Sequence, residues 1–266
     1  RVDRRQRQMC IRDRICTRHH LHAQQAIQAA QAGKAVFLEK PMALNQEELD
    51  ELLDVLTQTG IPFMVGFNRR FSPAATRAKE ILKKRTNPLV IIYRVNADYI
   101  PLDNWVQGEE GGGRIIGEAC HMFDLFNYFV GFEVSSVDIN AISPAPAHIL
   151  ARDNFVTTLK YVDGSVCTLI YTALGCAEMP KEYLEIYCDG KILVIDDFTE
   201  LRIYGSKEKG WKGLQDKGHL QELALFGSFV KNQSQIPISL QELISATEIS
   251  FVAEMQLAGK AIGNAL

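Results

Sequence analysis

The stretch HAQQAIQAAQAGKAVFLEKP, residues 22–41, decides the fold that this sequence predicts. Residues 22–32 are strong helix formers with small apolar side chains at helical spacing, and Gly33 follows where helices end in a left-handed residue. The apolar run that comes next predicts a short buried strand, which Pro41 ends. We therefore expect a helix that leads directly into a buried strand.

The residues that follow repeat this pattern. Asn45, with Glu48 three residues later, predicts the capped start of a helix over 46–59. The apolar run PFMVGF, 62–67, predicts another buried strand. Two strand-and-helix units at this spacing predict right-handed parallel crossovers. The fold class of residues 15–72 is therefore expected to be α/β, with a doubly wound parallel sheet.

Residues 73–266 have a different pattern. The turns Asp163-Gly164 and Asp189-Gly190 are strong hairpin signals, so the short strands around them predict an open, mainly antiparallel sheet. Helices are expected on its flanks, which gives an α+β domain after the α/β domain. The expected helices are 73–85, 114–130, 217–232 and 240–262, and the expected strands are 89–99, 134–142, 154–162, 165–173, 182–188, 191–196 and 200–204.

The composition is ordinary for a globular protein, with 47% hydrophobic and 23% charged residues in a chain of 266. No apolar run approaches the roughly 20 residues that span a bilayer, and no secretory signal opens the chain, so we expect no membrane partner. The six cysteines contain no C-x-x-C pair, which favours reduced thiols in a cytoplasmic protein.

The net charge of −3 is unevenly distributed, because residues 1–18 hold seven arginines and only two aspartates. No aromatic or glycine-rich element accompanies these arginines, so we expect no nucleic-acid partner. The string QMCIRDR does not resemble native coding sequence. We therefore interpret residues 1–14 as a non-native leader.

The first candidate for chemistry is Glu39-Lys40-Pro41, at the carboxyl end of a predicted buried strand. Ligands of doubly wound sheets bind at such strand ends, where a lysine can stabilise a developing alkoxide or help to move its proton. A surface lysine at a strand exit is the alternative interpretation.

The second candidate lies on the helix after Gly111-Gly112-Gly113. Gly117, His121 and Asp124 share one helical face, with Glu118 to one side. A histidine beside carboxylates suits proton transfer, and also suits a metal ion; a capping acid and a core histidine are the plain alternative. The glycine run is not a G-x-G-x-x-G motif, because Ile116 stands at the last glycine position.

Two further segments carry candidate ligand contacts. Asn68-Arg69-Arg70-Phe71 follows a strand, where guanidinium groups suit a phosphate or a carboxylate. Thr17-Arg18-His19-His20-Leu21-His22 precedes a helix. Its histidines do not converge on one ion, so a helix start that contacts a ligand is the favoured interpretation, and no metal is expected.

Together these stretches resemble the Gfo/Idh/MocA family of oxidoreductases from about residue 15 onward. The strongest match is H-x(10)-G-K-x-V-F-x-E-K-P, from His22 to Pro41, and GFNRRFSP agrees as well. GGGRIIGEACH is also similar to the carboxyl-terminal module of bi-domain oxidoreductases. The resemblance implies that residues 15–72 are the carboxyl-terminal part of a Rossmann NAD(P)-binding domain, and that residues 73–266 form a substrate and oligomerisation domain.

The resemblance also implies a function. It implies hydride transfer between NAD or NADP and a secondary alcohol of a sugar, nucleotide sugar or cyclitol, in a homo-oligomer that associates through the sheet domain. Lys40 would stand near the nicotinamide, His121 would act as acid/base or hydrogen-bond the substrate, and Asp124 would line the same site. The residues implied to contact the cofactor are Thr17, His19, His22, Glu39, Lys40, Pro41 and Arg70.

Two departures from the family pattern matter. Many members carry aspartate where this chain has Gly117, and Glu118 beside it points about 100° away on a helix, so its catalytic role is an open candidate. No G-x-G-x-x-G occurs anywhere in the sequence. We therefore expect an amino-terminally truncated chain that binds cofactor poorly and turns over little substrate alone. The alternatives are a non-catalytic association module and a metal-dependent hydrolase or isomerase built on His121, Glu118 and Asp124.

Overall fold

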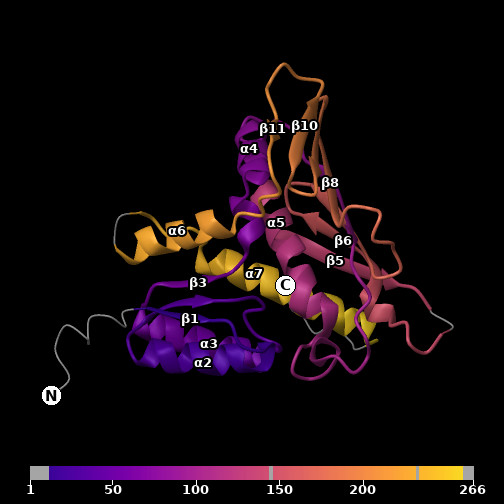
Figure 1. Cartoon of the computed structure of the whole chain (residues 1–266). Coiled ribbons are helices and arrows are strands. Elements are labelled where there is room, and N and C mark those ends of the chain that lie inside the picture. Colours follow the sequence, from indigo (N-terminus) through magenta and orange to yellow (C-terminus); the bar gives the residue numbers. More distant parts are fainter. Residues whose placement is uncertain (1–11, 144–145, 232–233, 260–266) are drawn as a thin grey trace.

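The computed structural model describes residues 12–143, 146–231 and 234–259, which form two sheets with helices around them (Figure 1). The smaller sheet has three parallel strands in the order β1-β2-β3. This confirms the doubly wound start that the sequence predicts. Its elements are β1 (Arg12–Ile15), the 3-10 turn η1 (His19–Leu21), α2 (His22–Gln31), β2 (Ala35–Leu38), α3 (Gln46–Thr59), β3 (Phe63–Val65) and the 3-10 turn η2 (Asn68–Phe71).

Local signals set the ends of these helices as the sequence indicates. The Asn45 side chain accepts a hydrogen bond from the Glu48 N–H at 2.9 Å, which caps α3. Gly33 and Gly60 take φ values of +69° and +59°, which residues with a Cβ adopt only with strain. The four residues of β2 are all buried, as expected of a strand covered on both faces.

Strand β1 is not predicted by the sequence. Arg12, Asp13 and Arg14 pair in parallel with Ala35, Val36 and Phe37, so the fold includes residues before 15. Of the four β1 residues only Ile15 is buried, and so β1 shows no apolar run. Most of the expected non-native leader, residues 1–11, lies outside the described part of the chain.

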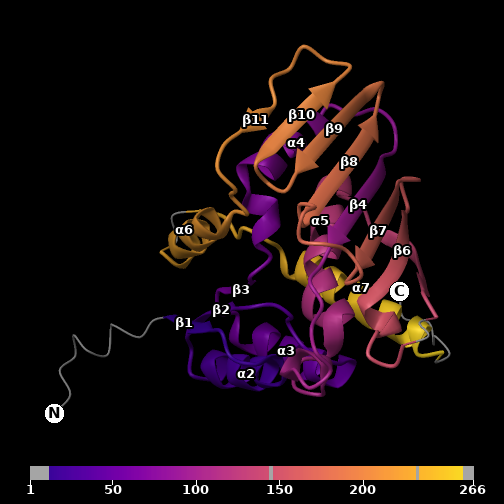
Figure 2. The ribbon, with the colours of Figure 1, turned by 45° about the vertical axis from the view of Figure 1, so that its right-hand side comes forward.

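The larger sheet has eight strands in the order β11-β10-β9-β8-β4-β7-β6-β5 (Figure 2). Its pairings are antiparallel except that β4 runs parallel to β7, because β4 is inserted between two hairpins. The strands are β4 (Val90–Asn96), β5 (Val134–Ala141), β6 (Asn154–Tyr161), β7 (Val166–Thr172), β8 (Glu182–Cys188), β9 (Lys191–Asp196), β10 (Glu200–Tyr204) and β11 (Trp211–Lys212), the last of which the sequence does not predict.

The helices of this part differ from expectation at one place. The helix expected over 114–130 is a π-helical turn, η4 (Ile115–Ala119), followed by α5 (Cys120–Val130). A π-turn of this kind is often found at functional sites. The other helical elements are α4 (Pro73–Leu82), η3 (Trp105–Gln107), η5 (Ala151–Asp153), α6 (His219–Val230) and α7 (Leu240–Leu257).

Two apolar cores hold the structure together, and the last helices belong to both parts. Phe226 of α6 and Leu243 of α7 pack into the core of the smaller sheet, while Ile249 and Val252 of α7 pack into that of the larger sheet. The chain passes from the smaller sheet to the larger one between β3 and β4, but α6 and α7 return to the core of the smaller sheet (Figure 1). Within the described ranges, no helix has the length and apolar character needed to span a membrane.

Candidate active site

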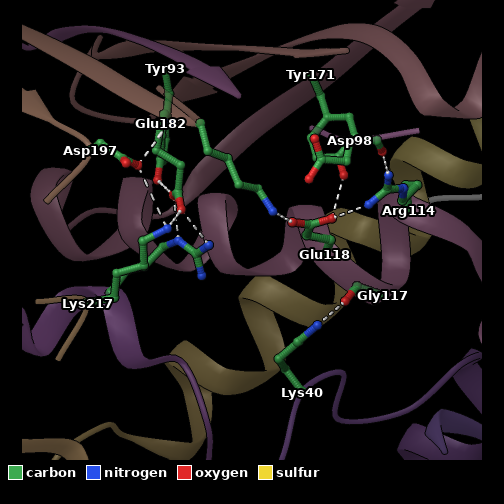
Figure 3. A network of polar contacts seen from close by, with 12 residues as sticks. Lys40, Tyr93, Asp98, Arg114, Gly117, Glu118, Tyr171, Glu182, Asp197 and Lys217 are labelled. Atoms are coloured by element: carbon green, nitrogen blue, oxygen red, sulfur yellow. Dashed lines mark hydrogen bonds and ion pairs between the residues drawn. The ribbon is translucent and has the colours of Figure 1, made fainter. Parts of the chain in front are cut away.

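Lys40 follows β2 at the edge where the three parallel strands end. Its ammonium group donates a hydrogen bond of 2.7 Å to the carbonyl oxygen of Gly117 in the π-helical turn (Figure 3). The two sheets therefore meet at this lysine. Pro41, which follows through a cis peptide bond, is buried.

His22 joins the ends of β1 and β2. Its ring nitrogens lie 2.8 Å from the carbonyl oxygen of Pro41 and 3.0 Å from that of Thr17. The side chain is 1% exposed. His22 thus fixes the segments that carry Lys40 and Thr17, and any contact it makes with a cofactor is indirect.

His121 lies at the start of α5, one turn after Gly117. Its side chain is 7% exposed, its ring packs edge-on against Phe67, and its buried Nδ1 has no hydrogen-bond partner within the described residues. Burial and the nearby charges of Arg69 and Lys40 hold the pKa of His121 well below its ordinary value. The imidazole is therefore uncharged at neutral pH.

Glu118 is fully occupied by partners of the larger sheet and its loops. It accepts hydrogen bonds from Lys181 at 2.7 Å, Arg114 at 2.8 Å and Tyr171 at 2.5 Å (Figure 3). Although burial opposes it, the charge of Lys181, with help from Tyr171 and Arg114, lowers the pKa of Glu118 to about 2. A carboxylate held in this way is a poor proton acceptor, so Glu118 acts by positioning Lys181 and Arg114.

A second buried carboxylate, Glu182, anchors the start of β8. Arg69 binds it through two hydrogen bonds of 2.7 and 2.9 Å, Lys217 donates at 2.6 Å, and the hydroxyl of Tyr93 donates as well. The charges of Arg69 and Lys217 outweigh burial and keep the pKa of Glu182 far below its ordinary value. Figure 3 shows this cluster beside the Glu118 cluster.

Arg70 and Asp124 form a buried ion pair with each other, away from Lys40. Arg70 donates two hydrogen bonds to Asp124, at 3.0 and 2.5 Å, and one to Glu242 at 2.8 Å. Their side chains are 3% and 0% exposed. The sequence suggested that the arginines after β3 bind a phosphate or carboxylate of a ligand, but the carboxylate that Arg70 binds belongs to Asp124 of the protein itself. This geometry leaves neither Arg70 nor Asp124 free to meet a ligand.

The other expected cofactor residues surround the ends of β1 and β2. The Thr17 hydroxyl donates to Gln25, and Glu39 accepts from Arg14 at 2.9 Å. His19 is 8% exposed and its Nδ1 lies 2.8 Å from the carbonyl oxygen of Gly111. These side chains gather at one edge, as expected of residues that follow parallel strands.

The structure does not support the metal alternative. Within residues 12–143, 146–231 and 234–259, no three His, Cys, Asp or Glu side chains are placed to hold an ion. Glu118 and Asp124 turn to separate cationic partners, which explains why His121 does not share a ligand set with them.

Sequence reasoning missed several residues of the site. Lys181 directly precedes β8, Arg114 directly precedes η4 and Tyr171 lies in β7, and His219 at the start of α6 lowers the pKa of His121 through its charge. The sole signal in the sequence is the alternation of β7, which makes Tyr171 an inward residue. Nothing in the sequence shows that Lys181 meets Glu118, 63 positions earlier.

The comparisons with known proteins identify the family of this chain. Residues 14–67 match the oxidoreductase family model for an NAD-binding Rossmann fold, and residues 78–234 match the model for the C-terminal α/β domain of the same family. The chain belongs to the Gfo/Idh/MocA oxidoreductase family. The fold expected from the sequence is thereby confirmed, and members of this family include NAD-dependent dehydrogenases.

Three relatives of this Gfo/Idh/MocA chain show the extent of the likeness. Myo-inositol 2-dehydrogenase of Thermotoga maritima is 24% identical over 92% of this chain and 77% of its own length. The uncharacterized oxidoreductase YrbE of Bacillus subtilis is 28% identical over 58% of this chain and 46% of its own length. A levoglucosan dehydrogenase solved with NADH superposes with a TM-score of 0.80 at 22% identity, covering 94% of this chain and 78% of that one. The match with YrbE thus spans about half the length of that protein.

Proposed function

We propose that this protein is an NAD(P)-dependent dehydrogenase that acts on a secondary alcohol of a sugar, nucleotide sugar or cyclitol. The observation that carries the proposal is the meeting of Lys40 with Gly117, beside the uncharged His121, at the carboxyl edge of the parallel sheet. The family relatives that act on myo-inositol and levoglucosan support this class of substrate.

The residues at the strand ends fit the nicotinamide end of the cofactor. They offer a hydroxyl from Thr17, an ammonium group from Lys40 and the uncharged imidazoles of His19 and His121, and none of these brings a negative charge to a redox-active ring. A nicotinamide bound there would supply the acceptor or donor of the hydride. The sequence holds no G-x-G-x-x-G turn for the pyrophosphate, so we infer weak binding by the 266-residue chain alone.

The chemistry of the chain's own side chains follows from their charges. Lys40 can hold the oxygen of the reacting alcohol and stabilise the alkoxide that develops as hydride leaves. His121, uncharged in its apolar surroundings, can accept or share a hydrogen bond from the same hydroxyl. Glu118, the residue after Gly117, keeps the side chains of Lys181 and Arg114 in place.

The open face of the larger sheet supports the expected homo-oligomer. Val156 of β6 and Ile170 of β7 are directly opposite each other and are 41% and 38% exposed, on the face turned away from the core that α5 and α7 complete. We propose that a second copy covers this face. The double variant Val156→Lys/Ile170→Lys should lower the molar mass measured by light scattering to that of one chain.

Trp105 offers a direct test of cofactor binding. Its ring contacts His19 at 4.9 Å between centroids, so energy transfer from Trp105 to a bound reduced nicotinamide should be efficient. NADH and NADPH are titrated against the 266-residue chain and against the product of its complete gene. Trp105→Phe should abolish the transfer signal, while Trp211→Phe, in β11, should preserve it.

The outcome discriminates between the two candidate classes. Transfer that depends on Trp105 supports the dehydrogenase. If neither cofactor binds to either form, the dehydrogenase proposal fails and a non-catalytic association module takes its place.

A further inference from the structure

The site has few groups that can receive a proton. Oxidation of an alcohol releases a hydride and a proton, and the usual acceptors of the proton are histidine and carboxylate side chains. Glu118 is bound by three donors, and Asp124 is bound on both oxygens by Arg70. Two imidazoles of the described residues, those of His19 and His121, are close enough to Lys40 to feel its charge and remain as candidate acceptors.

The two imidazoles differ in the support they give to a positive charge. Nδ1 of His121 is buried without a partner, so a proton gained by this ring would leave an unsupported cation beside Arg69 and Lys40. Nδ1 of His19 lies 2.8 Å from the Gly111 carbonyl oxygen. A carbonyl oxygen can only accept, so Nδ1 of His19 carries the hydrogen and Nε2 keeps its lone pair. The same carbonyl would stabilise the ring once Nε2 is protonated.

The charge state of His19 is compatible with this use. Burial lowers the pKa of His19 to about 4, with smaller contributions from Lys40, His22 and His20, while the Gly111 carbonyl opposes the shift. The ring is therefore uncharged at neutral pH and its Nε2 is available. The ring of Trp105 packs edge-on against it and fixes its plane.

His19 also occupies the space that a side chain at residue 117 would need. A Cβ on Gly117 would lie 2.9 Å from Cε1 and 3.2 Å from Nδ1 of His19, and 3.3 Å from the Gly111 oxygen. The carbonyl group of the same Gly117 receives the Lys40 ammonium group. Lys40 and His19 therefore both lie at residue 117, and a side chain at this position would need His19 to shift.

We propose that His19 is the proton acceptor of this site, in the space that a carboxylate at residue 117 would otherwise fill. The proposal rests on the proposed dehydrogenase function. With an oxidised nicotinamide bound to accept hydride, the alcohol would give up the C–H electron pair, its O–H bond would break, and C=O would form. The O–H proton makes the new N–H bond at Nε2 of His19, from which it passes to solvent. Lys40 holds the oxygen throughout.

The first test needs no turnover. Long-range ¹H–¹⁵N spectra of the 266-residue chain report the tautomer of each histidine, and His19→Ala assigns the His19 signals. We expect an uncharged ring protonated on Nδ1 at pH 7, with its midpoint near pH 4. A charged ring at pH 7, or a proton on Nε2, overturns the proposal whether or not any substrate is turned over.

The second test exchanges the two acceptors. In the complete gene product, with NAD⁺ and either myo-inositol or levoglucosan as probe, His19→Ala should lower kcat by about 10²-fold or more. The dissociation constant for NADH is measured beside kcat, and kcat is taken at saturating NAD⁺, so that a loss of proton transfer is separated from a loss of cofactor binding. The double variant His19→Ala/Gly117→Asp should recover at least about tenfold, since the vacated space accepts the carboxylate. His19→Ala/Gly117→Ala is the matched control and should not recover.

The failures are distinguishable. Weaker NADH binding with a normal kcat at saturating NAD⁺ in His19→Ala would make His19 a cofactor contact alone, and full activity of His19→Ala would exclude it as acceptor. Exposed His148→Ala should behave as wild type in both assays. If the wild-type gene product binds no nicotinamide cofactor, the dehydrogenase function itself fails, and the proton-acceptor role of His19 fails with it.

Discussion

The two sides of the candidate site satisfy their polar groups in opposite ways. On the side of the larger sheet, the buried carboxylates Glu118 and Glu182 are each bound by several cationic or hydroxyl donors. On the side of the parallel sheet, His19 and Glu222 are buried without an ionic partner, and burial holds both uncharged at neutral pH. The comparison teaches that the paired side supplies a rigid frame, while the proposed proton acceptor lies on the side where these groups have no ionic partner among the described residues.

The largest expected effect comes from breaking the frame. Glu182→Ala leaves Arg69 and Lys217 buried without their carboxylate, which should cost about 3–5 kcal/mol of unfolding free energy. Urea denaturation at pH 7 measures it. Glu185→Ala, on the same strand but partly exposed, is the control and should change stability by no more than about 0.5 kcal/mol. Equal losses in the two variants would show that the cluster contributes nothing.

Substitutions on the side of the parallel sheet should change the activity of the enzyme more than the stability of the fold. Lys40→Met removes the group that holds the reacting oxygen, so kcat in the complete gene product should fall by about 10²–10³-fold. The melting temperature should stay close to that of wild type, because Lys40 makes one hydrogen bond, to a neutral carbonyl. Exposed Lys84→Ala provides the comparison. A Lys40→Met enzyme with normal kcat would remove Lys40 from the mechanism.

The contribution of the Glu118 cluster to the free energy of unfolding should depend on pH in the acidic range. The pKa of Glu118 is about 2 in the folded chain against 4.5 for the ordinary group. Its stabilising contribution is therefore complete above about pH 4.5 and is lost as pH falls toward 2. Glu118→Gln should be less stable than wild type by about 2 kcal/mol at pH 6, and the difference should shrink at pH 3. A difference that does not vary with pH would mean that the carboxylate charge is irrelevant.

The smallest expected effect is that of Glu222 on folding stability, and it changes with pH in the opposite direction to that of Glu118. Burial and the charge of Glu39 raise the pKa of Glu222 to about 9 from 4.5. Ionisation of this carboxyl group is disfavoured in the folded state, so its penalty is absent below about pH 4.5 and grows as pH rises toward 9. Glu222→Gln should leave stability unchanged at pH 4.5 and increase it by about 1 kcal/mol or more at pH 8.5. Exposed Glu109→Gln should show no such trend in the same thermal scans.

Local signals in the sequence predicted most of the fold. Asn45, Gly33 and Gly60 mark helix ends through backbone chemistry that acts over a few residues, and the buried run of β2 is visible as an apolar block. Strand β1 was missed because Arg12, Asp13 and Arg14 carry no apolar pattern, and its pairing with β2 depends on residues about 20 positions away. Strand β4 shows its own alternation, but its place between β7 and β8 is a property of the whole sheet.

The candidate site was less predictable than the fold. Lys40 and His121 were identified from motifs, and the structure brings both to Gly117 or its neighbours. The pairing of Arg70 with Asp124 was not foreseen, because the two are 54 positions apart and each looks available when its segment is read alone. Ion pairs form between residues that the fold brings together from distant parts of the sequence. Sequence motifs therefore identify the charged groups, but not which of them remain free to bind a ligand.

The return of α6 and α7 to the smaller sheet has a consequence for synthesis on the ribosome. The strands β1 to β3 are made first, but Phe226 and Leu243, which complete their apolar core, are translated about 150 residues or more later. At the usual elongation rates of about 5–20 residues per second, the first sheet must wait for several seconds with that face uncovered. During this interval the nascent chain is a candidate client for a holdase chaperone, and a pause or premature stop before residue 219 would leave a partly built, aggregation-prone sheet.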